Sequence, residues 1–200
     1  MRKVPSNALF FIAIFAISTG ASAHTGTDSH LHGSFMTGLF HPFLGLDHLL
    51  AMLAVGTWSA LVARRADATL LRGPLAFANM LLVGAMLGLQ GVEAITVEPM
   101  VAASVLVLGL LVLTRLQLDS IASMGLAGGF ALFHGLAHGA ELASAADPVM
   151  AIAGMYVSTL ALHVVGLAAG WTLRASPLWA TRATGAAVAA SGAALLLQLA

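Results

Sequence analysis

Six apolar segments, each close to the length of a membrane-spanning helix, dominate this sequence. A helix crosses the hydrocarbon core of a bilayer with about 20 apolar residues, and it satisfies its own backbone hydrogen bonds there. Hydrophobic residues make up 60% of the chain and charged residues 8%, far from the balance of a soluble domain. The sequence therefore predicts an all-α integral membrane protein. Its predicted spans are residues 43–63, 75–91, 97–114, 121–143, 149–173 and 179–199.

The N-terminus has the pattern of a cleavable secretory signal peptide. Arg2 and Lys3 precede a short apolar run over residues 8–17, and an Ala-Ser-Ala triplet that ends at Ala23 forms a cleavage site. An uncleaved first helix is the alternative, but the apolar run is short for a span. We therefore expect residues 1–23 to be removed.

A polar segment, residues 24–40, precedes the transmembrane domain of residues 41–200 and is expected to be flexible and external. It contains His24, His30 and His32, which are secondary candidates for binding metal. Cleavage after the signal peptide would allow His24 to chelate through its amine and imidazole together. The alternative is a mobile polar tail.

Basic residues are distributed unevenly among the predicted loops. With the mature N-terminus outside, the loops after spans one, three and five face the cytoplasm. They hold every basic residue beyond the signal peptide: Arg64, Arg65, Arg72, Arg115, Arg174 and Arg182. This distribution satisfies the positive-inside rule. We expect a multi-pass protein of the bacterial inner membrane, with both mature termini on the external side.

Two groups of ionisable residues interrupt the apolar spans. They are His41, Asp47 and His48 at the start of span one, and His134, His138 and Glu141 in span four. The second group follows an i, i+4, i+7 spacing, which confines it to an arc of about 60° on a helix. On a continuous helix, His41 and His48 would also point almost the same way, about 10 Å apart. Because spans one and four run in opposite directions, both groups reach the outer half of the bilayer, with His134 nearer the midplane.

These residue types and spacings predict a metal site. Two histidines one helical turn apart can grip one ion, and a carboxylate one turn further can complete the site. The chain has no cysteine, and imidazole with carboxylate suits nickel, cobalt or zinc better than copper(I), magnesium or calcium. The alternative is a structural polar network without an ion. His163 in span five is a further secondary metal candidate, or a hydrogen-bond partner of a neighbouring helix.

Small residues recur at a spacing of four, which lets helix backbones approach closely in lipid. The pairs are Gly84 and Gly88, Gly125 and Gly129, Gly135 and Gly139, and Gly166 and Gly170. We expect Gly135 and Gly139 to admit span one, so that both ionisable groups share an ion. Asn79 is either a helix–helix hydrogen bond or a ligand on the exit side. A homo-oligomer is compatible with these patterns.

The net charge of the chain and the motifs it contains narrow the range of possible functions. The formal net charge is zero, and no basic patch indicates a nucleic-acid partner. A permease with metal sites in series is the leading hypothesis. The alternative is an intramembrane hydrolase that uses metal-activated water, although the chain lacks an HExxH motif and an obvious spare base. A bis-histidine haem bundle would leave the carboxylates without a role.

Two stretches, HPFLGLDHLLAMLAVG (residues 41–56) and FHGLAHGAE (residues 133–141), resemble the signatures of the HupE/UreJ family of nickel/cobalt permeases. The similarity in span number and signal peptide covers essentially the whole chain. The resemblance implies a transporter without a prosthetic group, which supplies nickel, or cobalt, for the maturation of hydrogenase or urease. It also implies that the six ionisable residues above are the functional positions.

Overall fold

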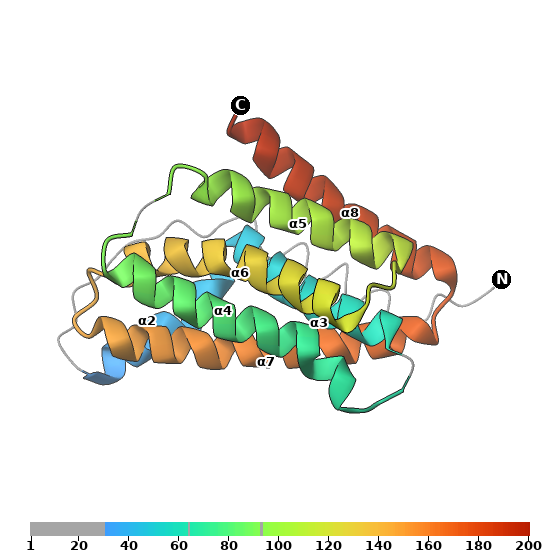
Figure 1. Cartoon of the computed structure of the whole chain (residues 1–200), viewed down its shortest axis with the longest axis horizontal. Coiled ribbons are helices and arrows are strands. Elements are labelled where there is room, and N and C mark those ends of the chain that lie inside the picture. The colour runs from blue at the N-terminus through green and yellow to red at the C-terminus, as the bar shows by residue number, and fades with distance from the viewer. Residues whose placement is uncertain (1–30, 64, 93) are drawn as a thin grey trace.

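The computed structural model describes residues 31–63, 65–92 and 94–200, and every regular element among them is helical (Figure 1). The helices are α2 (Leu31–Phe40), η1 (His41–Phe43), α3 (Leu46–Val62), η2 (Ala68–Leu71), α4 (Arg72–Leu89), α5 (Val97–Thr114), α6 (Ser120–Leu142), α7 (Pro148–Arg174) and α8 (Leu178–Gln198). The predicted signal peptide, His24 and His30 lie outside the described residues. The all-α class predicted from the sequence is confirmed.

Five helical segments of the described chain are long and apolar enough to cross a membrane. A sixth span is obtained if residues 33–43 and α3 count as one, although these two pieces are bent by 76°. The sequence predicted a continuous first span over residues 43–63, and this is wrong at its outer end. The physical reason is local: Pro42 lies in η1, and Gly45 adopts an extended conformation (φ −100°, ψ 119°) before α3 begins.

Residues 31–40 also differ from the expected flexible tail, because they form α2 and pack against α7. Gly38 and Gly154 lie at this contact, where an added Cβ would collide with the backbone oxygens of Ala151 and Phe35 respectively. The hydroxyl of Ser34 accepts a hydrogen bond from the backbone N–H of Asp147 at 3.0 Å. Close backbone packing and this bond hold α2 in place, so the ordered domain starts before residue 41.

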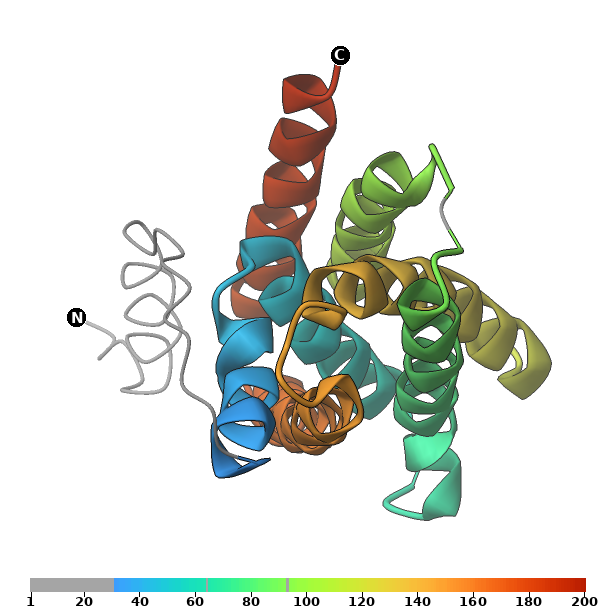
Figure 2. The same ribbon diagram turned by 90° about the vertical axis from the view of Figure 1, so that its left-hand side faces the viewer.

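The remaining helices associate in three pairs: α4 with α6, α5 with α8, and α3 with α7 (Figure 2). Helix α3 also contacts α5 and α4, and so connects the pairs. The predicted glycine pattern accounts for much of this packing, since Gly84 lies against Gly135 and Gly88 against Gly139. The pair Gly125 and Gly129 is an exception, because an added Cβ at either residue would meet nothing within 4 Å.

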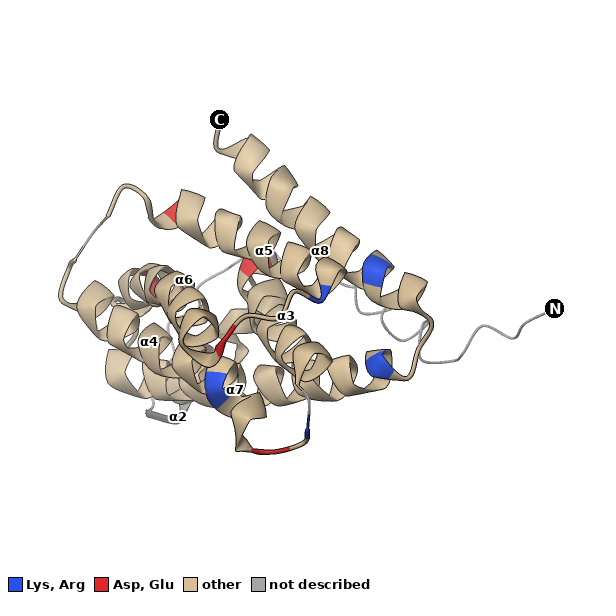
Figure 3. Ribbon diagram, turned by 45° about the vertical axis from the view of Figure 1, so that its right-hand side comes forward, with Lys and Arg blue, Asp and Glu red and all other residues tan. Residues whose placement is uncertain are grey.

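The arginines of the described chain lie at or near the same set of helix ends (Figure 3). Hydrogen bonds from Arg72, Arg115 and Arg174 tie these ends together. Arg174 donates to the backbone oxygens of Ala60 and Ala63 at 3.1 and 2.6 Å, and Arg115 donates to the hydroxyl of Thr181. The predicted polar residues of spans one and four lie toward the opposite ends of their helices.

Candidate metal centre

The break between η1 and α3 places His41 beside the C-terminal end of α6. Its Nε2 atom lies 2.8 Å from Glu141 Oε2, and His138 Nδ1 lies 3.5 Å from the same oxygen. One ligand atom from each of these three residues lies within 4.8 Å of the others, which suits a single metal ion. Because His41 belongs to η1 rather than to a continuous span-one helix, its position depends on this break.

His48 and Asp47 reach the same region from the first turns of α3. The ring centroids of His48 and His138 are 3.9 Å apart, and His48 Nδ1 lies 2.7 Å from His134 Nδ1. Asp47 Oδ1 accepts a hydrogen bond from the backbone N–H of His48 at 2.8 Å, and it lies 3.9 Å from His48 Nε2. The structure therefore gathers both predicted groups into one histidine–carboxylate cluster. Its members are His41, Asp47, His48, His134, His138 and Glu141.

The side chains of the cluster range from solvent-exposed to fully buried. The side chain of Glu141 is 52% exposed and that of His41 is 20% exposed, whereas His134 and His138 are fully buried. Neither ring nitrogen of His138 makes a hydrogen bond to another described residue. A buried polar atom without a partner is costly, so His138 has unused capacity to bind a ligand.

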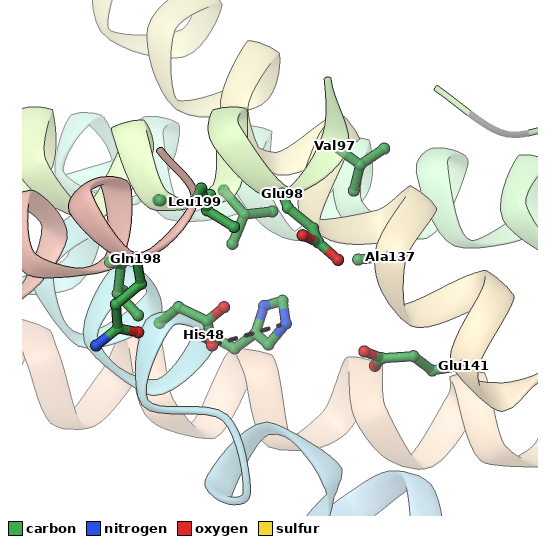
Figure 4. A pocket seen from close by; sticks show the side chains of 11 residues that line it. His48, Val97, Glu98, Ala137, Glu141, Gln198 and Leu199 are labelled. Carbon is green, nitrogen blue, oxygen red and sulfur yellow. Dashed lines mark hydrogen bonds and ion pairs between the residues drawn. The ribbon is translucent and has the colours of Figure 1, made fainter. Parts of the chain in front are cut away.

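A cavity of about 240 Å³ opens beside the cluster, between the N-terminal ends of α3 and α5 and the C-terminal ends of α6 and α8 (Figure 4). Its polar lining comprises His48, three carboxylates and an amide: Asp47, Glu98, Glu141 and Gln198. Figure 4 shows Glu98 and Glu141 with their carboxylates extending into the space beside His48. Glu98 and Gln198 were not among the metal-site residues predicted from the sequence, although Glu98 was expected on an external face that attracts cations. Their only signal was a position at the predicted external ends of spans three and six.

Ser104 of α5 was also missed by the sequence analysis. It is fully buried, and its Oγ atom lies 2.7 Å from His134 Nε2. Serine is common at helix contacts in membranes, so nothing in its sequence position distinguished it.

His163 of α7 is not part of the cluster, but it contacts the same aromatic residue, Phe77, as His134 does. The ring of Phe77 is 5.6 Å from that of His134 and 5.3 Å from that of His163. His163 is 2% exposed, and neither of its ring nitrogens makes a hydrogen bond to a described residue. The simple interpretation of His163 as a helix–helix hydrogen bond is therefore wrong. Asn79 does have this role, since it accepts a hydrogen bond from the Tyr156 hydroxyl at 3.1 Å.

The glycines beside the span-four histidines, Gly135 and Gly139, pack against α4 and not against span one as the sequence predicted. An added Cβ on Gly135 or Gly139 would collide with the backbone oxygen of Leu81 or Ala85, and both of these belong to α4. Helix α4 carries no histidine or carboxylate. The close glycine contact therefore stabilises the packing of α6 on α4, while α3 approaches the histidines from another side of α6.

Comparison with known proteins agrees with the two signature stretches. The family model described as HupE / UreJ protein matches residues 12–195. The chain belongs to the HupE/UreJ family. It is similar to Protein HupE of Rhizobium leguminosarum bv. viciae, with 37% identity over 187 residues, which cover 93% of this chain and 95% of that relative. No solved structure matches the chain significantly. Family and helix content together describe a multi-pass membrane protein of the HupE/UreJ type.

Proposed function

We propose that this HupE/UreJ protein is a permease that carries nickel, or cobalt, inward through the histidine–carboxylate cluster. The observation that supports this function best is the convergence of His41, His138 and Glu141 on one point. Neither ring nitrogen of His138 makes a hydrogen bond to a described residue, so one of them is available to bind the ion. The transported ion would supply the maturation of hydrogenase or urease. Family membership favours transport over the metal-dependent hydrolase considered above.

The interatomic distances suit a divalent transition-metal ion. Ligand atoms about 2.1 Å from such an ion lie about 3.0 to 3.4 Å from one another. The observed separations are 2.8 Å for His41 and Glu141 and 3.5 Å for His138 and Glu141, and the ligand atoms of all three residues lie within 4.8 Å of one another, so side-chain shifts would bring them to an ion. Imidazole nitrogens with carboxylate oxygens favour nickel, cobalt or zinc over magnesium and calcium.

The arrangement also supports a direction of passage. Glu98 and Gln198 line the outer cavity, so a hydrated cation would meet a carboxylate before it reaches the histidines. Electrostatic focusing of this kind raises the local cation concentration. The membrane potential then contributes about 2.3 kcal/mol per unit charge per 100 mV to inward movement.

The inner part of the path would lead past Phe77 to His163. Because the ring of Phe77 packs against both His134 and His163, we expect it to move when an ion passes. If His163 is a relay, His163→Ala should slow nickel uptake but leave nickel binding at the outer cluster unchanged. Uptake at the wild-type rate would remove His163 from the path.

Uptake of radioactive nickel into cells tests the proposed function. His48→Ala and His138→Ala should abolish uptake at equal expression, because each removes a nitrogen from the cluster. Asn79→Ala is the matched control, since it removes a polar intramembrane group whose partner is Tyr156 rather than the cluster. Competition by cobalt, zinc and magnesium would define the selectivity. Normal uptake by both histidine variants would contradict the proposal.

A further inference from the structure

A chain of hydrogen bonds runs from the backbone of α5 to the ring of His48. The hydroxyl of Ser104 donates to the backbone oxygen of Val101 at 2.6 Å. The same hydroxyl lies 2.7 Å from His134 Nε2, and the other nitrogen of His134 lies 2.7 Å from His48 Nδ1. The chain thus crosses from α5 through α6 to α3.

The carbonyl at one end sets the direction of every proton in this chain. A carbonyl oxygen can only accept, so the single proton of the Ser104 hydroxyl points to Val101. Ser104 Oγ must then accept a proton from His134 Nε2–H. His134 is fully buried and forms no ion pair with a described residue. A buried, unpaired imidazolium would be costly, so His134 is neutral and carries only this proton.

The proton arrangement of His48 follows from that of His134. With its only proton on Nε2, His134 offers the lone pair of Nδ1, and His48 must donate its Nδ1–H to it. This leaves His48 Nε2 unprotonated. His48 lines the outer cavity together with Asp47, Glu98 and Glu141, so a lone pair is available where a metal ion would arrive.

We propose that Ser104 is a positioning residue that fixes the tautomer of His48 through His134, so that His48 Nε2 is ready to bind the transported ion. Metal-binding histidines usually engage their second ring nitrogen in a hydrogen bond that sets the tautomer and the ring orientation. Both nitrogens of His134 are occupied within the chain, so His134 supports the site and is not itself a ligand. The inference rests on the proposed function in taking His48 as a ligand.

Nitrogen-15 NMR of the metal-free wild-type protein, with ¹⁵N-labelled histidine in lipid nanodiscs, tests the tautomers of His48 and His134. Spectra of His48→Ala and His134→Ala assign the two rings. We expect His134 as the Nε2–H form and His48 as the Nδ1–H form. A wild-type His48 in the Nε2–H form would overturn the inference. Because no metal is present, this failure is distinct from a failure of the uptake assay.

Ser104→Ala tests the role of the hydroxyl. Without it, His134 loses the acceptor that holds its proton on Nε2, so His48 should no longer be restricted to the Nδ1–H form. The affinity for nickel chloride in titration calorimetry should fall by about 10- to 100-fold, as is typical when a group supporting a metal ligand is removed. Ser104→Thr keeps the hydroxyl and should restore both the tautomer and the affinity.

Ser158→Ala is the matched control. Ser158 is also buried, and its hydroxyl also donates to the carbonyl three residues earlier, that of Met155, but it forms no hydrogen bond to an imidazole of the described chain. This variant should change neither the histidine spectrum nor the nickel affinity. If Ser104→Ala behaves like Ser158→Ala in both measurements, the positioning role of Ser104 is wrong.

Discussion

The polar residues of this bundle fall into two groups, those whose side chains have a hydrogen-bond partner within the protein and those whose side chains have none. The side chains of Asn79 and Ser104 have hydrogen-bond partners on neighbouring helices. His138 and His163 are about as deeply buried as Ser104, yet their ring nitrogens have no hydrogen-bond partner among the described residues. A buried polar group in this condition requires an explanation, such as a bound water or ion. We therefore expect these two histidines to have capacity for a ligand that Asn79 and Ser104 lack.

Glu141→Gln tests the charged ligand of the cluster. Glutamine keeps the size of the side chain but removes the negative charge that faces His41 and His138. We expect nickel affinity, measured by titration calorimetry, to fall by at least about tenfold, which corresponds to ~1.4 kcal/mol.

Glu98→Gln is the control for this prediction, because Glu98 lines the outer cavity but forms no ion pair with a described residue. It should slow nickel uptake at low concentration more than it weakens binding at equilibrium. Equal effects of the two variants on binding would contradict the distinct role of Glu141.

Among the elements, the α4–α6 pair shows how the histidines of α6 are held in position. Gly84 and Gly88 lie against Gly135 and Gly139, so the two backbones touch along about one turn. In lipid, such contacts stabilise helix association through close packing rather than through exclusion of water. His134 and His138 are each adjacent in sequence to one of these glycines, so a shift of α6 relative to α4 would move both imidazoles.

Gly135→Ala should destabilise the protein and disturb the cluster. Its new Cβ would collide with the backbone oxygen of Leu81, and overpacking of this kind typically costs ~1–3 kcal/mol. The midpoint of thermal unfolding in detergent should fall. Gly125→Ala on the same helix is the control, because its Cβ would enter open space. That variant should be neutral, or more stable by up to about 1 kcal/mol. A lower midpoint for Gly125→Ala alone would contradict the packing of α4 on α6.

The molecule as a whole is polarised along its helices. Arginines and their backbone contacts occupy one set of ends, whereas the cavity and its carboxylates occupy the other. By the positive-inside rule, we expect the cavity end to face outward. In that orientation, the proposed metal site would serve uptake rather than export.

Cysteine labelling tests the orientation, because the chain has no cysteine of its own. Ser144→Cys lies in the exposed α6–α7 connection at the cavity end, and Ala175→Cys lies exposed beyond α7 at the arginine end. A membrane-impermeant maleimide should label the first variant in intact spheroplasts and the second only after the membrane is opened. The reverse pattern would invert the proposed direction of transport.

Much of the fold and part of the candidate site could be predicted from local properties of the sequence. Hydropathy and helical spacing predicted the helical class, five of the apolar spans, the grouping of His134, His138 and Glu141 on one helix face, and the meeting of this group with Asp47 and His48. These predictions succeed because span length and side-chain direction depend on residues close together in the chain. The glycine spacing likewise predicted close helix contacts, although not the identity of each partner.

Only the tertiary structure decided how these distant groups meet and which further residues support them. The bend after η1 places His41 beside Glu141, the glycine face of α6 receives α4 rather than α3, and Ser104 becomes the partner of His134. Judged by local sequence alone, small or polar residues on several helices could have made each of these contacts equally well. The choice among them rests on simultaneous packing of all the helices, which no segment of the sequence encodes alone.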